Sequence, residues 1–296
     1  MRKVTFLYLF IIIFCTKTFA LNIQNKQIVI NRNIIHYYQV YNPNNKLNLI
    51  MLTGIGTTAN FWPKEFIEIL AKKYNLYILD YRGINTQQNI SNLNYSINDL
   101  AKDTNAFIDT LKLKDLYLLG WSMGGAIALQ SAFDKPELFK HIFLISSAVP
   151  LNKQYHLPKK LSQTPVLNTK DDVYNYVFSN IIYNYSPKKI NKNISQFINP
   201  DISKLFPNNL VYAQQKRYLV SWMSNKNNLQ KFINIKVPVT FFLADNDEIL
   251  NINDLQKSIS MIKNKTIVNI IHFPASGHAI DWNYPYQLGF IIDDLA

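Results

Sequence analysis

The amino-acid sequence predicts an α/β fold in which a doubly wound, mostly parallel sheet carries an inserted helical lid. Short apolar segments of strand length alternate with helical segments over residues 47–146 and again over 237–296. This alternation is typical of parallel sheets covered by helices on both faces. In residues 151–232 the alternation stops, prolines recur and tyrosine and phenylalanine are dense. We therefore predict one core made of residues 21–150 and 233–296, with the lid at 151–232.

The predicted strands are short apolar or β-branched runs. Two β-rich segments around Asn31-Arg32-Asn33 indicate a leading hairpin. The predicted strands cover 28–35, 37–41, 47–52, 76–79, 116–119, 141–146, 237–243 and 266–273. One of the helices begins at Ser96-Ile97-Asn98-Asp99, which has the pattern of a capping box. The predicted helices cover 60–73, 96–113, 126–133, 253–262 and 281–296.

Residues 1–20 have the pattern of a secretory signal peptide. Arg2 and Lys3 form a short basic head, and the apolar run that follows ends at Cys15, shortly before the small residue Ala20. The run is shorter than the about 20 apolar residues that a membrane span needs. We expect cleavage near Ala20 and an exported protein, either periplasmic or secreted. An uncleaved N-terminal membrane anchor is the alternative.

Cysteine usage and charge exclude several classes of function. Cys15 is the only cysteine, so a mature chain has no disulfide, no thiolate metal site and no cysteine nucleophile. The net charge of +12 falls to +9 without residues 1–20, which hold three basic residues and no acid. The lysines are scattered, whereas a nucleic-acid surface clusters them. We expect no nucleic-acid partner, and contact with an anionic membrane surface stays open.

A G-x-S-x-G motif stands between a predicted strand and a predicted helix. The strand 116–119 leads into Gly120-Trp121-Ser122-Met123-Gly124, and the helix 126–133 follows. In this setting the serine occupies a sharp turn that lifts its hydroxyl clear of the backbone. Because Gly120 and Gly124 have no side chains, the strand and the helix can approach each other closely. The N-terminus of the helix favours negative charge near the serine. The motif therefore predicts that Ser122 is a nucleophile.

A serine hydroxyl needs a base that accepts its proton, and an imidazole serves best when a carboxylate holds its tautomer. Among the five histidines only His278 sits on a loop just beyond the carboxyl end of a predicted strand. Asp247 stands in the same way after the preceding strand, and Asp245 is its rival for the role of the acid. The three candidates therefore follow the order Ser122, Asp247, His278.

With these residues in view, the sequence resembles the α/β-hydrolase fold family, in particular its lid-bearing serine esterases and lipases. The order of nucleophile, acid and base is that of the family, and the resemblance covers about residues 26–150 and 233–296. It implies a Ser-Asp-His triad in which register favours Asp247 over Asp245. It also implies an oxyanion hole built from the backbone N–H groups of Met123 and Ile55, and neither a cofactor nor a metal.

Two stretches depart from the family pattern. The family usually has His-Gly where this chain has Thr53-Gly54; because the donor is backbone, the oxyanion hole survives, but which N–H donates stays open. After Asp80-Tyr81-Arg82-Gly83 the usual second glycine and serine are missing. Arg82 is expected to make a structural ion pair, and Trp121 is expected to bury its ring beneath the nucleophile.

The resemblance implies a function as well as a fold. It implies hydrolysis of a small-molecule or lipid carboxylic ester through an acyl-enzyme on Ser122. Peroxidases and carbon–carbon bond hydrolases of the family share the triad, so they remain alternatives. A non-catalytic binding protein on the same fold is a further alternative, because a fold does not fix a function.

Overall fold

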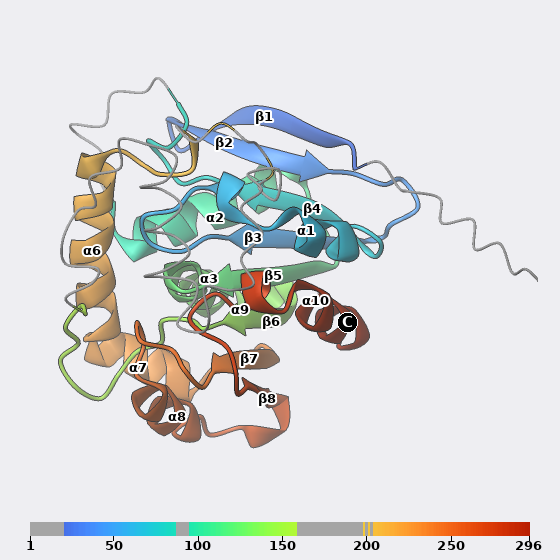
Figure 1. The fold of residues 1–296 in the computed structure, drawn as a ribbon. Coiled ribbons are helices and arrows are strands. Elements are labelled where there is room, and N and C mark those ends of the chain that lie inside the picture. The colour runs from blue at the N-terminus through green and yellow to red at the C-terminus, as the bar shows by residue number, and fades with distance from the viewer. Residues whose placement is uncertain (1–20, 87–94, 159–197, 199–200, 202–203) are drawn as a thin grey trace, which may run out of the picture.

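An eight-stranded sheet forms the centre of the molecule (Figure 1). The computed structural model describes residues 21–86, 95–158, 198, 201 and 204–296. The strand order is β1-β2-β4-β3-β5-β6-β7-β8, with β2 antiparallel to both neighbours and the other pairs parallel. The strands are β1 (Ile23–Ile30), β2 (Asn33–Val40), β3 (Leu47–Leu52), β4 (Tyr74–Leu79), β5 (Leu116–Trp121), β6 (Phe139–Ile145), β7 (Val239–Ala244) and β8 (Val268–Phe273). The predicted doubly wound, mostly parallel sheet is confirmed.

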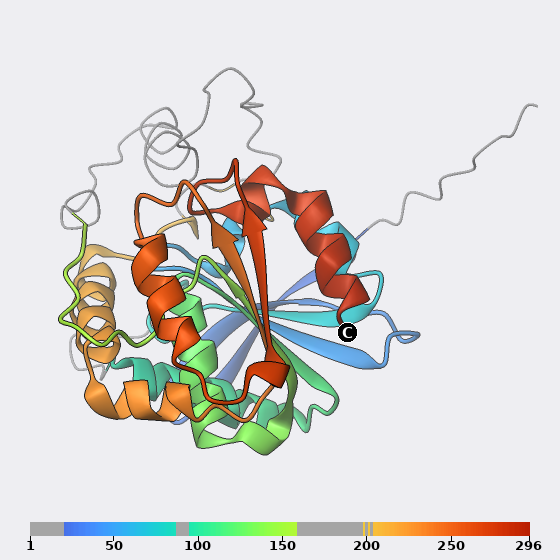
Figure 2. The same ribbon diagram turned by 90° about the horizontal axis from the view of Figure 1, so that it is seen from below.

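Helices cover both faces of the sheet and bury a separate apolar core on each (Figure 2). One core includes Phe107 of α2 and Ile127 of α3. The opposite core includes Phe66 of α1 and Leu288 of α10. The helices are α1 (Lys64–Leu70), α2 (Ile97–Leu111), α3 (Met123–Asp134), α6 (Asn209–Met223), α7 (Lys226–Ile233), α8 (Ile252–Ser260), α9 (Ile280–Asn283) and α10 (Pro285–Asp294). Short 3-10 turns in the described ranges include η1 (Ala59–Phe61), η2 (Pro136–Leu138) and η7 (Lys265–Ile267).

Element boundaries depart from the sequence prediction at prolines and at the first turn. The leading hairpin is present, but its first strand begins at Ile23 and its turn centres on Asn31 and Arg32, both with positive φ. Pro63 separates η1 from α1, and Pro285 begins α10 after α9 has ended. A proline supplies no N–H to a helix that precedes it, so each predicted helix is split in two.

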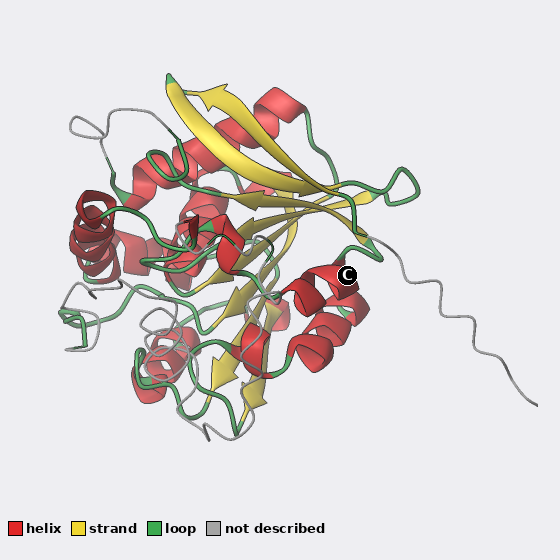
Figure 3. Ribbon diagram, turned by 45° about the horizontal axis from the view of Figure 1, so that its top comes forward, coloured by secondary structure: helices red, strands yellow, loops and turns green. Residues whose placement is uncertain are grey.

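The parallel strands bring their following loops to one edge of the sheet (Figure 3). The loops after β3, β4, β5, β7 and β8 all begin there, as expected for a doubly wound sheet. The predicted capping box of α2 is confirmed, since Asp99 N donates to Ser96 Oγ at 3.1 Å and Ser96 N donates to Asp99 Oδ2 at 3.2 Å. The candidate residues therefore lie on loops and turns at one edge of the sheet.

Two predicted segments fall largely outside the described residues. The predicted signal peptide, residues 1–20, is one, and residues 159–197 of the predicted lid are the other. The described part of the lid interval contains α6 and most of α7. Within the ranges that the structure describes, no helix is long and apolar enough to cross a membrane.

Candidate active site

Ser122 occupies a strained turn between β5 and α3. Its φ of 54° and ψ of −118° are rare for a residue with a side chain, and such a conformation persists only where the surroundings hold it. Three backbone hydrogen bonds do so: Ser122 N donates to Ile145 O, and Ser122 O accepts from the N–H groups of Gly125 and Ala148. The turn therefore fixes Ser122 at the carboxyl edge of the sheet.

Glycines allow this turn to pack against its neighbours. A Cβ at Gly120 would lie 2.6 Å from the carbonyl oxygen of Gly124, and one at Gly124 would lie 2.0 Å from Leu52 O of β3. These distances are shorter than real Cβ contacts, so only glycine fits. The predicted reason for both glycines is confirmed. Gly125 is equally constrained, because a Cβ there would meet Ser147 Oγ at 2.2 Å.

The structure brings Asp247 and His278 together on the loops after β7 and β8. His278 Nδ1 lies 2.8 Å from Asp247 Oδ2, and both side chains are buried, at 3% and 2% exposed. The other oxygen of Asp247 accepts from the N–H groups of Ile249 and Leu250. With the carboxylate holding the proton on Nδ1, a neutral imidazole leaves Nε2 as an acceptor. The pair thus has the arrangement that a histidine base requires.

Trp121 links the histidine loop to the turn. Its Nε1 donates to His278 O at 3.1 Å, and its ring lies 5.7 Å from the His278 ring, centroid to centroid. The indole also stacks on Phe61, with centroids 5.3 Å apart. The prediction that Trp121 buries its ring beneath the nucleophile is confirmed. Because Trp121 precedes Ser122, the indole ties the loop of the candidate base to the residue before the candidate nucleophile.

Asp245, the rival acid, pairs with a different histidine. Its Oδ1 lies 2.6 Å from His272 Nδ1, and both side chains are well exposed. His272 lies in β8 itself, before the loop that carries His278. The structure therefore separates the two aspartates: one belongs to a buried pair beside the Ser122 turn, and the other to a surface pair.

Two further histidines are held inside the core. His36 Nδ1 lies 2.6 Å from Asp80 Oδ2, and Asp80 Oδ1 accepts from Ala59 N. His141 Nε2 lies 2.8 Å from Thr240 Oγ1, and burial lowers the pKa of His141 to about 4. His36 contacts the residue that directly follows β4, and His141 contacts a residue of β7. Their contacts indicate structural roles.

The loop after β3 passes directly beside Ser122. A Cβ at Gly54 would lie 3.3 Å from Ser122 Cβ and 3.1 Å from the Trp121 ring. Ile55, the second predicted oxyanion donor, is the next residue. Met123, the first predicted donor, is the first residue of α3, so its N–H has no acceptor within the helix. Both predicted donors therefore lie in backbone adjacent to Ser122.

Sequence reasoning missed two residues that hold this loop. Thr57 Oγ1 donates to Gly54 O at 2.9 Å, and Gln215 Oε1 of α6 accepts from Gly56 N at 2.8 Å. A weak sequence signal exists for the contact between Thr57 and Gly54, because two threonines stand close together in a short loop that contains glycine. Gln215 lies 159 residues from Gly56, so no local pattern could have identified the second.

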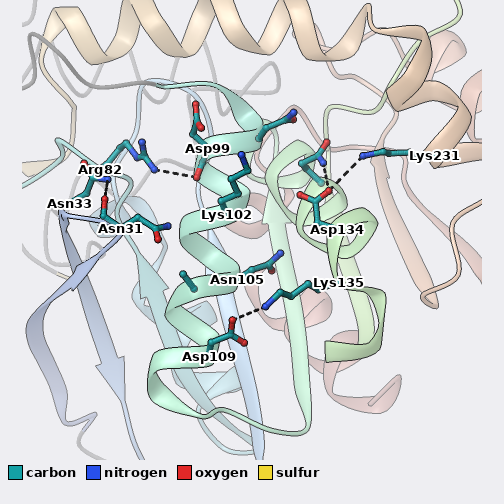
Figure 4. Close-up of a pocket in the computed structure, with 13 residues that line it drawn as sticks. Asn31, Asn33, Arg82, Asp99, Lys102, Asn105, Asp109, Asp134, Lys135 and Lys231 are labelled. Carbon is teal, nitrogen blue, oxygen red and sulfur yellow. Dashed lines mark hydrogen bonds and ion pairs between the residues drawn. The ribbon is translucent and has the colours of Figure 1, made fainter.

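Arg82 makes the structural ion pair that the sequence predicted. Its Nε donates to Asp103 Oδ2 of α2 at 2.7 Å, and the pair is buried. The same arginine borders a polar groove of about 630 Å³ between α2, α3 and α7 (Figure 4). Several charged side chains of the groove pair with one another, for example Lys135 with Asp109 and Lys231 with Asp134. Its lining includes none of the three candidate catalytic residues.

Acidic and histidine side chains do not gather into a metal site in the described residues, where no cluster of three or more His, Cys, Asp or Glu could hold an ion. The arrangement at the sheet edge instead offers a hydroxyl, a buried imidazole oriented by a carboxylate, and backbone N–H groups. These groups together can activate an oxygen nucleophile and stabilise an oxyanion.

Comparison with known proteins agrees with this geometry. A model of the alpha/beta hydrolase fold matches residues 48–283. The pimeloyl-[acyl-carrier protein] methyl ester esterase of Wigglesworthia glossinidia brevipalpis is 25% identical over 258 residues, which cover 83% of this chain and 92% of the relative. The uncharacterized hydrolase YugF of Bacillus subtilis is 30% identical over 119 residues, or 40% of this chain, and the match spans only 43% of YugF.

Solved structures show the same fold. An alpha/beta hydrolase fold protein from Chitinophaga pinensis matches with a TM-score of 0.72 at 16% identity, covering 93% of this chain and 98% of the other. At that identity the match speaks for the fold alone. Together with the family match, it confirms the predicted fold class.

Proposed function

The chain belongs to the alpha/beta hydrolase fold family, and from that premise we propose that it is a serine hydrolase that cleaves carboxylic esters. The observation that carries the proposal is the buried Asp247–His278 pair, which lies on the same sheet edge as the strained turn of Ser122. The relative that spans nearly the whole chain is named a methyl ester esterase. That name favours an ester over the other bonds that this family cleaves.

The reaction proceeds in two halves. In the first, His278 Nε2 accepts the Ser122 proton while Oγ attacks the ester carbonyl carbon, and a tetrahedral oxyanion forms. The intermediate collapses, the bond from carbon to the alcohol oxygen breaks, and His278 gives its proton to the departing alcohol. In the second half, His278 takes a proton from water while the water oxygen attacks the acyl carbon. The bond from that carbon to Ser122 Oγ then breaks, His278 returns the proton to Oγ, and the carboxylic acid leaves. Asp247 stabilises the imidazolium in both halves.

The oxyanion is the charge that the site must stabilise. The N–H of Met123 lies at the N-terminus of α3, where the helix dipole favours negative charge. The N–H of Ile55 comes from the loop that contacts Ser122. Donors of this kind are fixed before the reaction, and losing one typically costs about 10²- to 10³-fold in kcat.

We assign an apolar acyl group to the substrate. The loop after β3, residues 53–58, carries Ile55 and is called the oxyanion loop. Helix α6 packs against it, because a Cβ at Gly56 would lie 2.7 Å from the Tyr212 ring. An acyl chain that ran along this side of the loop would meet the Tyr212 ring. Comparing kcat/KM for p-nitrophenyl esters from acetate to octanoate tests this assignment, and a steady fall with chain length would instead indicate a short-chain esterase.

The test of the chemistry compares Ser122→Ala with Ser131→Ala. Ser131 is a buried serine of α3, the helix that follows Ser122, so it controls for loss of a core hydroxyl. We expect Ser122→Ala to lower kcat by about 10⁴-fold or more and to abolish labelling by a fluorophosphonate, whereas Ser131→Ala keeps both. Near-full activity of Ser122→Ala would contradict the proposal. Labelling of Ser122 without ester hydrolysis would favour a carbon–carbon bond hydrolase or a peroxidase. Absence of labelling would favour a non-catalytic binding protein.

We also propose export, with residues 1–20 removed as a signal peptide. The basic head and apolar run support this. Mass spectrometry of the mature N-terminus tests it: a chain that begins near residue 21 outside the cytoplasm is expected, and a cytosolic chain that begins at Met1 would contradict it.

A further inference from the structure

Three consecutive peptide groups of the oxyanion loop are each held by a side chain. Tyr81 Oη donates to Thr53 O at 2.6 Å, Thr57 Oγ1 donates to Gly54 O at 2.9 Å, and Gly56 N donates to Gln215 Oε1 at 2.8 Å. These contacts orient the peptides 53–54, 54–55 and 55–56 in turn. Burial raises the pKa of Tyr81, so its hydroxyl keeps its proton and remains a donor.

The middle peptide is held by two hydroxyl groups rather than one. Thr53 Oγ1 lies 2.6 Å from Thr57 Oγ1, and both threonines are buried. A hydroxyl has a single proton to donate. Because Thr57 donates its proton to Gly54 O, Thr53 must be the donor in the contact between the two hydroxyls. The proton order therefore runs from Thr53 to Thr57 to the carbonyl of Gly54.

The carbonyl of Gly54 and the N–H of Ile55 belong to the same peptide group. A trans peptide is planar, so its C=O and N–H point in opposite directions, and the described chain contains no cis peptide bond. Holding the Gly54 oxygen therefore also fixes the direction of the Ile55 N–H. Chains of hydrogen bonds polarise their members, so a carbonyl that accepts from a two-hydroxyl chain makes its own N–H a stronger donor.

We propose that Thr53 and Thr57 form a hydroxyl relay that positions and polarises the Ile55 N–H as a donor of the oxyanion hole. This inference rests on the proposed function, since it assigns the relay to the same acyl transfer on Ser122. The peptide that the relay holds begins at Gly54, where an added Cβ would lie 3.3 Å from Ser122 Cβ. Thr53 and Thr57 are thus positioning residues, which act through the backbone.

The relay explains the threonine at position 53. Its hydroxyl contacts Thr57 Oγ1 of the same loop, and within the described residues this is the only hydrogen bond of its side chain. A valine at position 53 would keep the shape but remove the first donor. A valine at position 57 would leave the Gly54 carbonyl without its hydroxyl partner, so the peptide that carries the Ile55 N–H could rotate.

The test uses Thr57→Val, Thr53→Val and Thr57→Ser in the full chain. We expect Thr57→Val to lower kcat for p-nitrophenyl butyrate by about 10- to 100-fold with KM changed less than about 3-fold, since a donor is misdirected rather than deleted. Thr53→Val should cost less, because the Thr57 bond to Gly54 remains. Thr57→Ser keeps the hydroxyl and should restore most of the activity. The rate of fluorophosphonate labelling of Ser122 should fall in the same order.

Thr104→Val is the matched control. Thr104 is a buried threonine of α2 whose hydroxyl donates to Leu100 O at 3.0 Å, so the same substitution removes the same kind of bond away from the loop. Equal losses in Thr104→Val and Thr57→Val, or a folded Thr57→Val with kcat within 2-fold of the parent, would overturn the relay. If Thr57→Val does not fold, the other two variants test the relay: Thr53→Val should lower kcat and the labelling rate of Ser122, and Thr57→Ser should keep most of both.

The failure of this inference can be told from failure of the proposed function. The amide proton shift of Ile55 in the NMR spectrum reports the relay without any turnover. We expect Thr57→Val to move it upfield and Thr104→Val to leave it unchanged. An unchanged shift in Thr57→Val would overturn the relay while leaving ester hydrolysis intact, whereas ester hydrolysis by Ser122→Ala would contradict the proposed function alone.

Discussion

Two histidine–aspartate pairs lie on neighbouring loops and strands at the same end of the sheet, and their distances alone do not distinguish them. His278 and Asp247 are 2.8 Å apart, and His272 and Asp245 are 2.6 Å apart. In both, Nδ1 faces the carboxylate. The difference is burial: the first pair is almost fully enclosed, whereas the side chains of the second are 40% and 35% exposed.

Burial changes what each pair can do. In water, an exposed ion pair gains little because solvent screens it, typically about 0–1 kcal/mol. In an enclosed site the same contact holds the ring in one tautomer and one orientation. Asp247 also accepts two backbone N–H groups, which fix the carboxylate itself. The comparison indicates that burial, rather than distance, separates a pair held in one geometry from a pair that solvent can rearrange.

The largest expected effect separates the two histidines. His278→Ala should lower kcat for p-nitrophenyl esters by about 10⁴-fold or more, because the serine loses its base. His272→Ala should leave kcat within about 3-fold, because its ring faces solvent and Asp245. Steady-state kinetics of the two purified variants check this. Equal losses in both would mean that the surface pair also supports the site.

The next effect separates the two aspartates. Asp247→Asn should reduce kcat by about 10³- to 10⁴-fold, because an amide at this position favours the wrong imidazole tautomer. Asp245→Asn should have a mild effect. Steady-state kinetics of both variants, with kcat/KM measured as a function of pH, check this ranking. The reverse ranking would transfer the role of the acid to Asp245.

Much of this comparison could be anticipated from the sequence. The strand-turn-helix setting of Ser122 and the loop position of His278 follow from local patterns, because apolar runs and glycines report backbone geometry directly. The choice between Asp245 and Asp247 was harder, since the residues are two positions apart on one loop. The partner of each depends on β8 and the loop that follows it, whose register against β7 the sequence places only approximately.

Other features depend on contacts far apart in the chain. Gln215 reaches Gly56, and Trp282 Nε1 donates to Phe61 O across 221 positions. No periodicity in the sequence encodes such contacts, because tertiary packing alone creates them. Pro63 and Pro285 are visible in the sequence. Whether each of them splits a helix depends on where the neighbouring helix begins, which the sequence does not fix. Predictions for the signal peptide and for the lid segment 159–197 stay predictions.

A third acid near His278 extends the comparison to a carboxyl that has no histidine partner. Asp281 of α9 is fully buried, and within the described part of the chain neither of its carboxyl oxygens accepts a hydrogen bond of normal geometry, although the backbone N–H groups of Asp281 and Trp282 lie nearby. Burial raises the pKa of Asp281 to about 7, and the N–H groups of Asp281 and Trp282 offset only part of that rise.

Stability should therefore fall with rising pH because of Asp281. The folded protein binds its proton more tightly than the unfolded chain does, so between about pH 4 and about pH 7 folding takes up protons and the free energy of unfolding decreases as pH rises. Asp281→Asn should be more stable than the parent by about a few kcal/mol at pH 8, with the gain vanishing below about pH 4. Urea denaturation at several pH values measures this; a gain that is independent of pH would contradict it.

The smallest expected effect tests the surface pair itself. Because His272 and Asp245 are exposed, Asp245→Asn should change the free energy of unfolding by less than about 1 kcal/mol, and added salt should shrink the difference further. Asp247→Asn should cost more, because it disturbs a buried hydrogen-bonded pair, and salt should hardly alter that cost. Denaturation curves at low and high ionic strength measure both variants side by side. If the Asp245 variant proved as destabilised and as insensitive to salt as the Asp247 variant, burial would not be what separates the two pairs, and position relative to Ser122 would have to explain the difference alone.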